Sequence, residues 1–332
     1  MVTTAFTYTD LIEMARVPPG KKIDLRKDFD PGFSGGGWTK QAANQRLEEG
    51  IQALAEWQDK LYADDTYAML IVLQAMDAAG KDGTIKHVMS GVNPQGVSVN
   101  SFKIPSTEEL DHDYLWRYQR ALPGRGHIGI FNRSHYEEVL VVRVHPAILA
   151  GQKLPAKAKG RGVWQRRFRE INDWERYLTD QGFVFVKLFL NLSKEEQRRR
   201  FLARIDLPEK NWKFSSNDAK ERAYWDDYQK AFADVLTNTS TDWAPWWVIP
   251  ADDKPFARVA AAAIIANALI RIDPKYPKVS KDQLADLQVA KQTLEAEAPD
   301  GAAPDPIEAE LEAKDSAKAG DDGKRAKKSK KG

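Results

Sequence analysis

Uninterrupted apolar runs constrain the fold of this 332-residue chain more than any other feature. Residues 68–75 read AMLIVLQA and residues 183–190 read FVFVKLFL, so neither run alternates regularly between apolar and polar residues. Such runs are typical of strands in a parallel sheet that is covered on both faces. Because parallel strands need crossover connections, usually helices, the runs predict an α/β fold.

The chain between 67 and 273 alternates between strand-like and helix-like segments. Further strands are predicted at 97–102, 127–131 and 246–249. Apolar spacing and capping residues, among them a capping box of Ser106 and Glu109, predict helices between them. These helices are 107–121, 163–179, 194–205, 220–236 and 256–270. The alternation has the spacing of right-handed βαβ crossovers, so we predict a doubly wound parallel sheet of about five strands.

Three regions follow from this pattern. Residues 1–66 are expected to form an irregular N-terminal segment with one helix at 39–62, and residues 67–279 the core. Residues 280–332 contain no aromatic side chain, so they cannot bury enough apolar surface to offset the entropy of ordering. We expect disorder from about 285 onward, with a frayed helix near 281–297 as the one exception.

Composition removes several classes of protein and site. The chain has no cysteine, which excludes disulfides, thiolate metal sites and cysteine nucleophiles. Its longest apolar stretch, 259–270, is shorter than the roughly 20 residues of a membrane span, and its N-terminus lacks a signal-peptide pattern. We therefore expect a cytoplasmic protein. The net charge of +2 does not by itself demand a polyanionic partner.

A glycine-containing segment follows the first apolar run directly. It reads QAMDAAGKDGT (74–84) and lies where the strand ends and a helix is expected to begin. Backbone N–H groups at a helix N-terminus attract anions, and a lysine beside them reaches phosphoryl oxygens. Compared with the pattern GxxxxGK[ST], Ala75 stands for the first glycine and Asp82 for the Ser or Thr. We interpret the segment as a phosphate loop; the alternative is an ordinary turn with a surface lysine.

Carboxylates and an arginine accompany this loop. Asp77 brings negative charge towards a phosphate site, which makes sense if it holds Mg²⁺ or orients an acceptor, although it could instead cap the turn. The segment FNRSHYEE (131–138) comes at the end of another strand, where doubly wound sheets bind ligands. Asn132 stands where phosphate-loop kinases hold the metal with an acidic residue. Arg133 and Glu137 are therefore the candidates for phosphate and metal.

A basic segment follows the apolar run at 183–190. Its members are Arg198, Arg199, Arg200, Arg204, Lys210, Lys213, Lys220 and Arg222. About half of these charges are expected to be solvated or paired with Glu195 and Glu196. The others lie at the sheet edge that carries the phosphate loop, and we interpret the segment at about 204–222 as a basic lid.

Five blocks of the sequence resemble the polyphosphate kinase 2 family. They are MDAAGKDGTIKHVMSGVNPQG (76–96), FKIPSTEELDHDYLWR (102–117), GHIGIFNRSHYEEVLVVRVHP (126–146), WKFSSNDAKERAYWDDYQKAF (212–232) and TSTDWAPWWVIPADDKPFAR (239–258). The form FNRSHYE, where other members carry an Asp-Arg-Ser motif, resembles the subgroup that phosphorylates both nucleoside monophosphates and diphosphates. The resemblance implies a thymidylate-kinase-like P-loop core with a helical lid, inorganic polyphosphate as donor, and Mg²⁺.

The resemblance also assigns roles to individual residues. The family's Walker A Asp and Lys correspond to Asp77 and Lys81, and its Arg-Ser pair to Arg133 and Ser134. Because Asn132 replaces the Asp of that motif, its metal role does not carry over, and Glu137 is the candidate for the compensating carboxylate.

We therefore predict a P-loop kinase-like enzyme that reversibly transfers a phosphoryl group from polyphosphate to AMP or ADP. The predicted catalytic residues are Asp77, Lys81, Arg133 and Glu137, with Asp77 and Glu137 at the metal. The residues predicted to bind phosphate are Ala78, Ala79, Gly80, Asp82, Gly83, Thr84, Arg198, Arg204, Lys210 and Lys213, and those predicted to bind nucleotide are Arg117, Asn132 and Ser134. We expect a homo-oligomer without nucleic-acid or membrane partners. An ATP-dependent nucleotide kinase and a polyanion-binding module without turnover remain as alternatives.

Overall fold

The computed structural model describes residues 6–36 and 38–297 of the chain. Within the described part of the chain, residues up to Pro277 form one compact unit, and those from Lys278 form a second. The first unit therefore contains both the N-terminal segment and the predicted core. The further division of that unit at residue 66 stays a prediction.

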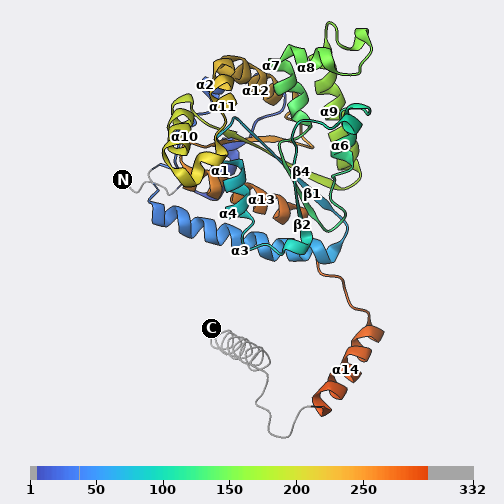
Figure 1. Cartoon of the computed structure of the whole chain (residues 1–332). Coiled ribbons are helices and arrows are strands. Elements are labelled where there is room, and N and C mark those ends of the chain that lie inside the picture. Colours follow the sequence, from blue (N-terminus) through green and yellow to red (C-terminus); the bar gives the residue numbers. More distant parts are fainter. Residues whose placement is uncertain (1–5, 37, 298–332) are drawn as a thin grey trace, which may run out of the picture. The chain divides into compact units, whose positions relative to one another are not determined.

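A five-stranded, wholly parallel sheet lies at the centre of the first unit (Figure 1). Its strands are β1 (Ala68–Ala75), β2 (Val97–Ser101), β3 (Ile128–Asn132), β4 (Phe183–Asn191) and β5 (Trp246–Pro250). Their order in the sheet is β2-β3-β1-β4-β5. The predicted doubly wound α/β fold is confirmed, and each predicted strand agrees with an observed one to within a residue at either end.

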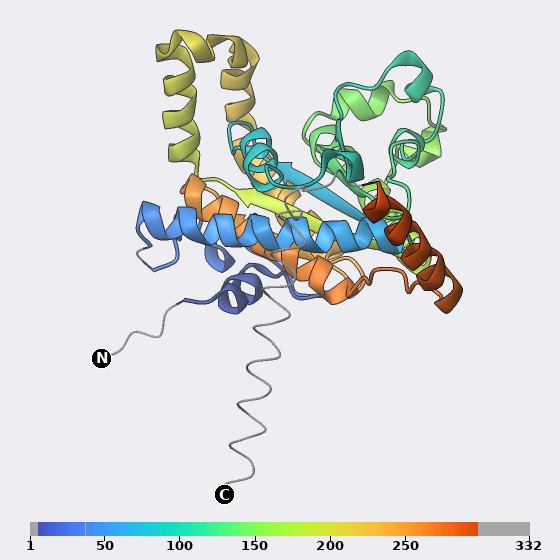
Figure 2. The same cartoon turned by 90° about the horizontal axis from the view of Figure 1, so that it is seen from below.

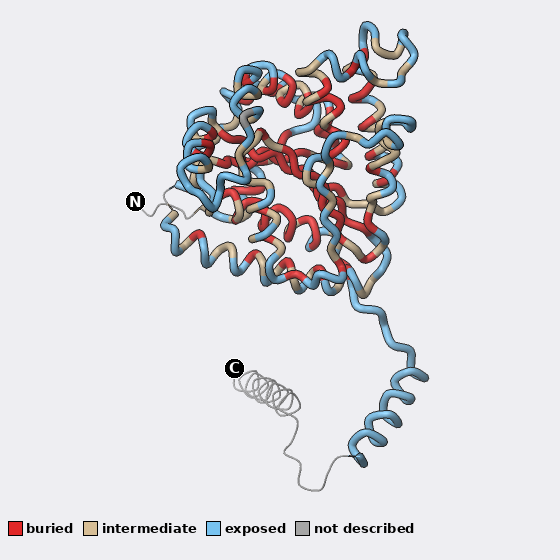
Figure 3. The backbone as a smooth tube through the Cα atoms, viewed as in Figure 1, coloured by how far each residue is buried: buried red, intermediate tan, exposed pale blue. Residues whose placement is uncertain are grey.

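Two helical layers cover the sheet, and they divide the residues of β1 between them. Ile71 and Leu73 pack in the layer that contains α3 (Lys40–Asp64) and α13 (Lys254–Ile272). Leu70 and Val72 pack in the other layer, against α9 (Val163–Asp180) and α12 (Trp225–Thr239). Successive side chains of a strand point to opposite faces, so a run that is apolar at nearly every position buries both faces. Figure 3 shows a buried centre in the first unit, and the edge strand β2 is the one strand of the sheet with no buried residue.

Among the described residues, α13 is the one helix that is both long and strongly apolar. Its length and hydropathy would suffice to cross a membrane, but most of it is buried inside the protein, as for a core helix. Gly50 of α3 lies directly against it: a Cβ at this position would come within 3.2 Å of the Cβ of Ala262. The absence of a side chain at Gly50 thus lets the two helices approach closely.

The N-terminal segment is more regular than its composition suggests. Residues 1–37 were expected to be irregular, yet α1 (Tyr8–Ala15) and α2 (Leu25–Asp28) form within them. A capping box between Thr7 and Asp10 begins α1, and its apolar face is buried. That capping box is legible in the sequence and would have predicted the helix.

The predicted helix at 107–121 does not form as one element. It is divided into α5 (Thr107–Leu110) and α6 (Trp116–Gln119), although the predicted capping box of Ser106 and Glu109 is present. The Asp113 side chain accepts a hydrogen bond from the backbone N–H of Leu115 at 2.9 Å. Asp offers the backbone this local alternative to a helical hydrogen bond, which ends the regular periodicity.

Two groups of helices stand out on one side of the sheet in Figure 2. One consists of α10 (Lys194–Asp206) and α11 (Ser216–Glu221), coloured olive, and the other includes α7 (Val141–Val144) and α8 (Pro146–Gly151), coloured green. The predicted helix 220–236 is observed as α11 and α12 with a short 3-10 turn between them. In the second unit, the helix expected near 281–297 is α14 (Lys281–Ala296), and none of its residues is buried. The prediction of disorder beyond it lies outside the described residues from 298 on.

Candidate functional site

The loop between β1 and α4 (Lys81–Val88) contains two residues with left-handed backbone conformations. Gly80 precedes the helix with φ of 109°, a conformation that favours glycine, and Ala78 adopts φ of 63°. Arg133, just after β3, has φ of 65°. Left-handed conformations at non-glycine residues cost roughly 1–2 kcal/mol and gather at functional sites. Both strained residues occur where neighbouring parallel strands end, since Leu73 pairs with Asn132.

Arg200 of α10 holds this loop in place. Its Nη1 donates to the backbone oxygens of Ala78 and Ala79 at 3.0 and 2.8 Å, and its Nη2 donates to those of Ala251 and Asp252 at 2.6 and 3.0 Å. The residue is only 7% exposed. The sequence placed Arg200 in the basic segment but did not assign it to the site. Its contacts show a positioning role: one guanidinium joins α10, the phosphate loop and the end of β5.

The four predicted catalytic residues converge at the ends of β1 and β3. Arg133 Nη2 lies 3.2 Å from Asp77 Oδ1, and Lys81 Nζ donates to the backbone oxygen of Ala75 at 2.9 Å. Burial lowers the pKa of Lys81, while the charge of Asp77 opposes that shift. Burial raises the pKa of Glu137, and Arg133 and Lys81 oppose it. The positive charges of Lys81 and Arg133 and the negative charges of Asp77 and Glu137 therefore stabilise one another at this edge of the sheet.

The segment after β3 is held by polar contacts below the surface. Gln74 donates from Nε2 to Ser134 Oγ at 3.0 Å, and Ser134 is fully buried. Asn132 Nδ2 donates to Asp82 Oδ1 at 2.7 Å, which joins β3 to the first turn of α4. Asn132 therefore orients a loop carboxylate in this structure, while Ser134 shapes the turn from beneath.

Three cavities meet at the phosphate loop. The central cavity, about 560 Å³, is lined by Asp77, Lys81, Asn132 and Arg133 among others. The acceptor-side cavity, about 580 Å³, shares Asp77 and Arg133 with it and extends past Glu137. The basic cavity, about 260 Å³, lies on the other flank of the loop and shares Ala78 and Gly80 with the central one. The loop therefore separates two spaces that both reach it.

Cationic side chains line the basic cavity from two directions. They are Arg200, Arg204, Lys210, Lys213, Lys254 and Arg258. Among the residues that the structure describes, none of the side chains lining this cavity is acidic. A space with this lining is complementary to a polyanion.

Comparison with known proteins identifies the family to which the chain belongs. A model of polyphosphate kinase 2 (PPK2) matches residues 37–277, which includes the phosphate loop, both strand ends and the basic cavity. The chain belongs to the polyphosphate kinase 2 family. The family resemblance drawn from the sequence blocks is thereby confirmed.

Characterised relatives cover most of the chain. An ADP-polyphosphate phosphotransferase of Rhodopseudomonas palustris is 48% identical over 283 residues, which is 84% of this chain and 96% of that protein. An AMP/ADP-polyphosphate phosphotransferase of Meiothermus ruber is 44% identical, over 79% of this chain and 94% of that protein. The crystal structure of polyphosphate kinase 2 from Arthrobacter aurescens TC1 superposes with a TM-score of 0.77 at 39% identity, covering 88% of this chain and 99% of the other.

Most residues predicted for this polyphosphate kinase 2 site do line the three cavities. Those that do are Asp77, Ala78, Ala79, Gly80, Lys81, Asp82, Gly83, Thr84, Asn132, Arg133, Glu137, Arg204, Lys210 and Lys213. Residues of the predicted lid at 204–222 line all three, although the helix that carries Arg204 begins earlier, at Lys194.

Three predicted residues lie outside these cavities. Arg198 is 53% exposed and pairs at 2.6 Å with Glu195 on its own helix, so it belongs to the solvated face. Arg117 lies 3.3 Å from Glu109 and packs over the ring of Phe102. Ser134 is buried beneath its loop. The ligand contacts proposed for Arg117, Arg198 and Ser134 stay predictions.

Two cations of the basic cavity were missed by sequence reasoning. Lys254 and Arg258 lie one turn apart at the start of α13, which follows β5. The sequence did contain a signal for them, because both lie near the start of a helix that follows a predicted strand. In a doubly wound sheet such a helix begins at the same edge as the phosphate loop. Residues so far apart in the chain become neighbours only through the strand order.

The donor set of the site fits a hard cation with few protein ligands. No group of three or more His, Cys, Asp or Glu side chains suited to a metal occurs in residues 6–36 and 38–297. Asp77 and Glu137 are near enough that the charge of Asp77 raises the pKa of Glu137. Mg²⁺ is commonly held by one or two carboxylates together with phosphate oxygens and water, which two carboxylates in a phosphate site satisfy.

Proposed function

We propose that this protein transfers the terminal phosphoryl group of inorganic polyphosphate to AMP or ADP. The observation that carries the proposal is the basic cavity, lined by six cations on one flank of the phosphate loop. An acidic polymer suits that lining, whereas a nucleotide with its base does not need six cations. The relatives from Rhodopseudomonas palustris and Meiothermus ruber, named as polyphosphate phosphotransferases, support the same donor.

The basic cavity holds the donor in this proposal. Although Lys254 is exposed in part, partial desolvation and the neighbouring charge of Arg200 lower its pKa, Glu196 opposes that shift, and Arg258 and Lys210 contribute further repulsion. A bound polyanion relieves that repulsion, because each phosphate neutralises adjacent cations. The terminal phosphate of the chain then reaches the loop at Ala78 to Lys81.

The acceptor approaches from the opposite flank, through the acceptor-side cavity. A phosphate oxygen of AMP or ADP attacks the terminal phosphorus of polyphosphate in line, and the bond from that phosphorus to the bridging oxygen breaks. The shortened polyphosphate leaves with the bonding electrons. Phosphoryl transfer asks little covalent chemistry of a protein, so positioning and charge neutralisation supply the catalysis.

Each catalytic residue has a role that its contacts support. Lys81 gives up its contact with the Ala75 oxygen and binds the transferring phosphoryl group. Arg133 binds a phosphate oxygen of the acceptor, and its ion pair with Asp77 orients its guanidinium group. Asp77 and Glu137 would hold Mg²⁺, which when bound neutralises charge on the phosphate oxygens.

Assays with alternative donors separate this function from its rivals. With Mg²⁺ and AMP or ADP, polyphosphate should support rapid formation of ADP or ATP. An ATP-dependent nucleotide kinase would instead phosphorylate AMP with ATP and leave polyphosphate unused. A polyanion-binding module would retain polyphosphate without forming any nucleotide product. Assembly as a homo-oligomer and a cytoplasmic location remain part of this proposal.

A further inference from the structure

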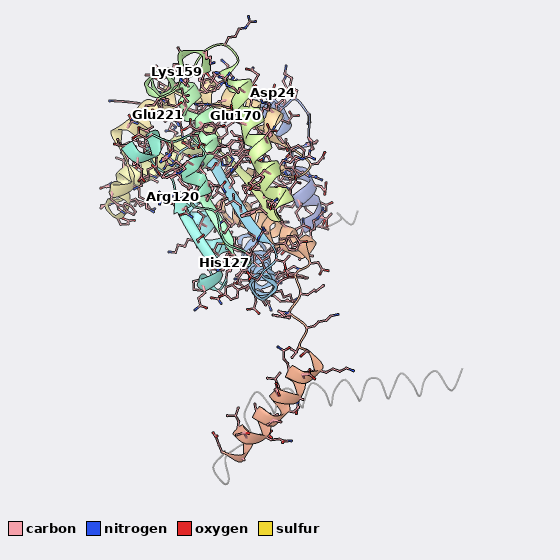
Figure 4. The ribbon with its side chains drawn as sticks, turned by 90° about the vertical axis from the view of Figure 1, so that its right-hand side faces the viewer. Asp24, Arg120, His127, Lys159, Glu170 and Glu221 are labelled. Atoms are coloured by element: carbon pink, nitrogen blue, oxygen red, sulfur yellow. The ribbon has the colours of Figure 1, made fainter. Side chains whose placement is uncertain are left out.

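The acceptor-side cavity differs in its lining from the basic cavity. Apolar side chains of Leu140, Val141, Ile148 and Phe232 line part of it, together with polar side chains that include His145, Asn217, Asp218, Glu221 and Tyr228. Glu221 is at the end of α11 and is labelled in Figure 4. Apolar side chains beside a few placed polar groups are the lining expected for the base of a nucleotide, and Arg133 of the same cavity is suited to its phosphates.

Two side chains from other elements fix the Glu221 carboxylate. His145, at the junction of α7 and α8, has its Nε2 3.0 Å from Glu221 Oε2. The Tyr228 hydroxyl of α12 donates to the same oxygen at 3.1 Å. Burial raises the pKa of Tyr228, and Glu221 raises it further, so the phenol keeps its proton and donates.

The other oxygen, Oε1, accepts no hydrogen bond from the residues that the structure describes. The Glu221 side chain is 23% exposed, so the group is within reach of a ligand in the cavity. Lys220 and Arg222 flank Glu221 in the chain, but neither forms an ion pair with it among the residues that the structure describes, and Arg222 donates instead to Gln197 and to the Lys194 backbone oxygen. A preoriented carboxylate oxygen is thus left as an acceptor.

Such an oxygen distinguishes an amino group from a carbonyl group. The 6-amino group of adenine is a hydrogen-bond donor and matches a carboxylate acceptor. The 6-oxo group of hypoxanthine or guanine is an acceptor, so the same position would bring two acceptors together. The N1–H of these bases is a donor, but it lies one ring position away from the 6-substituent, so it meets Oε1 only if the base shifts in the cavity. Because Oε2 is already occupied by two donors, the carboxylate cannot offer both oxygens side by side to the N–H edge of a guanine.

We propose that Glu221, positioned by His145 and Tyr228, selects acceptor nucleotides whose base carries a 6-amino group. This inference rests on the proposed function, because it names the base specificity of the same acceptor cavity. It identifies the acceptor as an adenine nucleotide and assigns a specificity-determining residue in the lid.

The test compares ADP with IDP, which differs from it by an oxo group in place of the 6-amino group and a proton on N1. With polyphosphate and Mg²⁺ saturating, kcat/KM for the wild-type protein should be about 10–100-fold higher for ADP, the range expected for one hydrogen bond to a charged group. Glu221→Gln offers both an amide donor and an acceptor, so the ratio should fall towards one, chiefly through KM. Equilibrium binding of ADP and IDP to the same proteins gives the comparison without turnover.

A matched control variant shows that the effect belongs to this carboxylate. Glu49 of α3 also accepts a hydrogen bond from a tyrosine hydroxyl, that of Tyr8 at 2.9 Å, but lines none of the three cavities. Glu49→Gln should leave the ADP-to-IDP ratio at its wild-type value. A wild-type ratio near one, or an unchanged ratio in Glu221→Gln, would overturn the inference. Failure to transfer phosphate from polyphosphate to any nucleotide would instead overturn the proposed function, and the binding ratio would still decide the role of Glu221.

Discussion

Removing Lys254 and Arg258 tests the donor side of the site most directly. Both line the basic cavity, neither is paired with a carboxylate in the residues that the structure describes, and neither contacts the loop backbone. Each Ala substitution therefore removes a charge without removing a support of the loop. We expect both single variants and the double variant to keep their fold.

The expected size of the effect follows from exposure. A unit charge about 4 Å from a phosphate is worth roughly 4 kcal/mol at an effective dielectric constant of 20. Lys254 is exposed and Arg258 half-buried, so solvent and salt reduce that value to about 1 kcal/mol each. Each substitution should therefore raise the KM for polyphosphate about 5-fold, and the double variant about 25-fold. The kcat and the KM for ADP should change little.

The assay is steady-state kinetics with polyphosphate of one chain length, at two salt concentrations. Added salt should raise the polyphosphate KM of the wild-type protein more steeply than that of the double variant, because fewer cations then contribute. Arg198→Ala is the matched control, since Arg198 is exposed and pairs with Glu195 outside the cavities. The reasoning fails if the double variant raises the KM for ADP instead, or if Arg198→Ala has the same effect on polyphosphate.

Four further variants test other parts of the structure. Lys81→Ala should lower kcat by at least about 100-fold, as for other donors lost from a transition-state contact, and a folded variant with ordinary kcat would remove the phosphate-loop assignment. Asp77→Asn should be almost as inactive, with partial recovery at high Mg²⁺ concentration; full activity at ordinary Mg²⁺ concentration would show that Asp77 only caps the turn. Burial lowers the pKa of His135, which lies 3.3 Å from Glu175, below the value it has in the unfolded chain. Below about pH 6.5 the unfolded chain therefore binds a proton at His135 that the folded protein does not, so the free energy of unfolding should fall by up to about 1.4 kcal/mol per pH unit. Urea titrations should show a flatter decline for His135→Gln, and an identical decline would refute this cause. Ending the chain after Pro277 removes only the second unit, so kcat and Tm should stay within error, and a drop in Tm of several degrees would show that this segment stabilises the first unit.

A buried polar network explains why the segment after β3 needs the whole fold. Lys187 of β4 lies 2.6 Å from Glu175 of α9 and also donates to the Tyr136 hydroxyl at 2.9 Å. Tyr136 donates in turn to Glu175 at 2.7 Å, and it precedes Glu137 in the chain. Sequence alone shows Lys187 as a lone charge in an apolar strand. Its partner is 12 residues earlier in the chain, on a helix that packs across the sheet, so only the packing reveals why the charge is tolerated.

What the sequence determined by itself is local. The runs at 68–75 and 183–190 are apolar at nearly every position, and that pattern specifies strands buried on both faces wherever they are placed. The phosphate loop was equally legible, because strand, glycine and lysine follow one another within a few residues. Capping at Ser106 was also predicted correctly, while the break caused by Asp113 was overlooked.

The tertiary structure decided which distant residues share a site. Strand order brings β1, β3 and β4 together, so Arg133 reaches Asp77 and Arg200 reaches Ala78 across 56 and 122 positions of the chain. The same order carries Lys254 and Arg258 to the basic cavity, and helix packing joins His145 to Glu221. Arg198 and Arg200 lie on the same helix but on different faces of it. Arg200 therefore contacts the loop, whereas Arg198 is exposed to solvent. Such choices depend on the direction in which a packed helix faces its neighbours, and no local pattern of residue types records that direction.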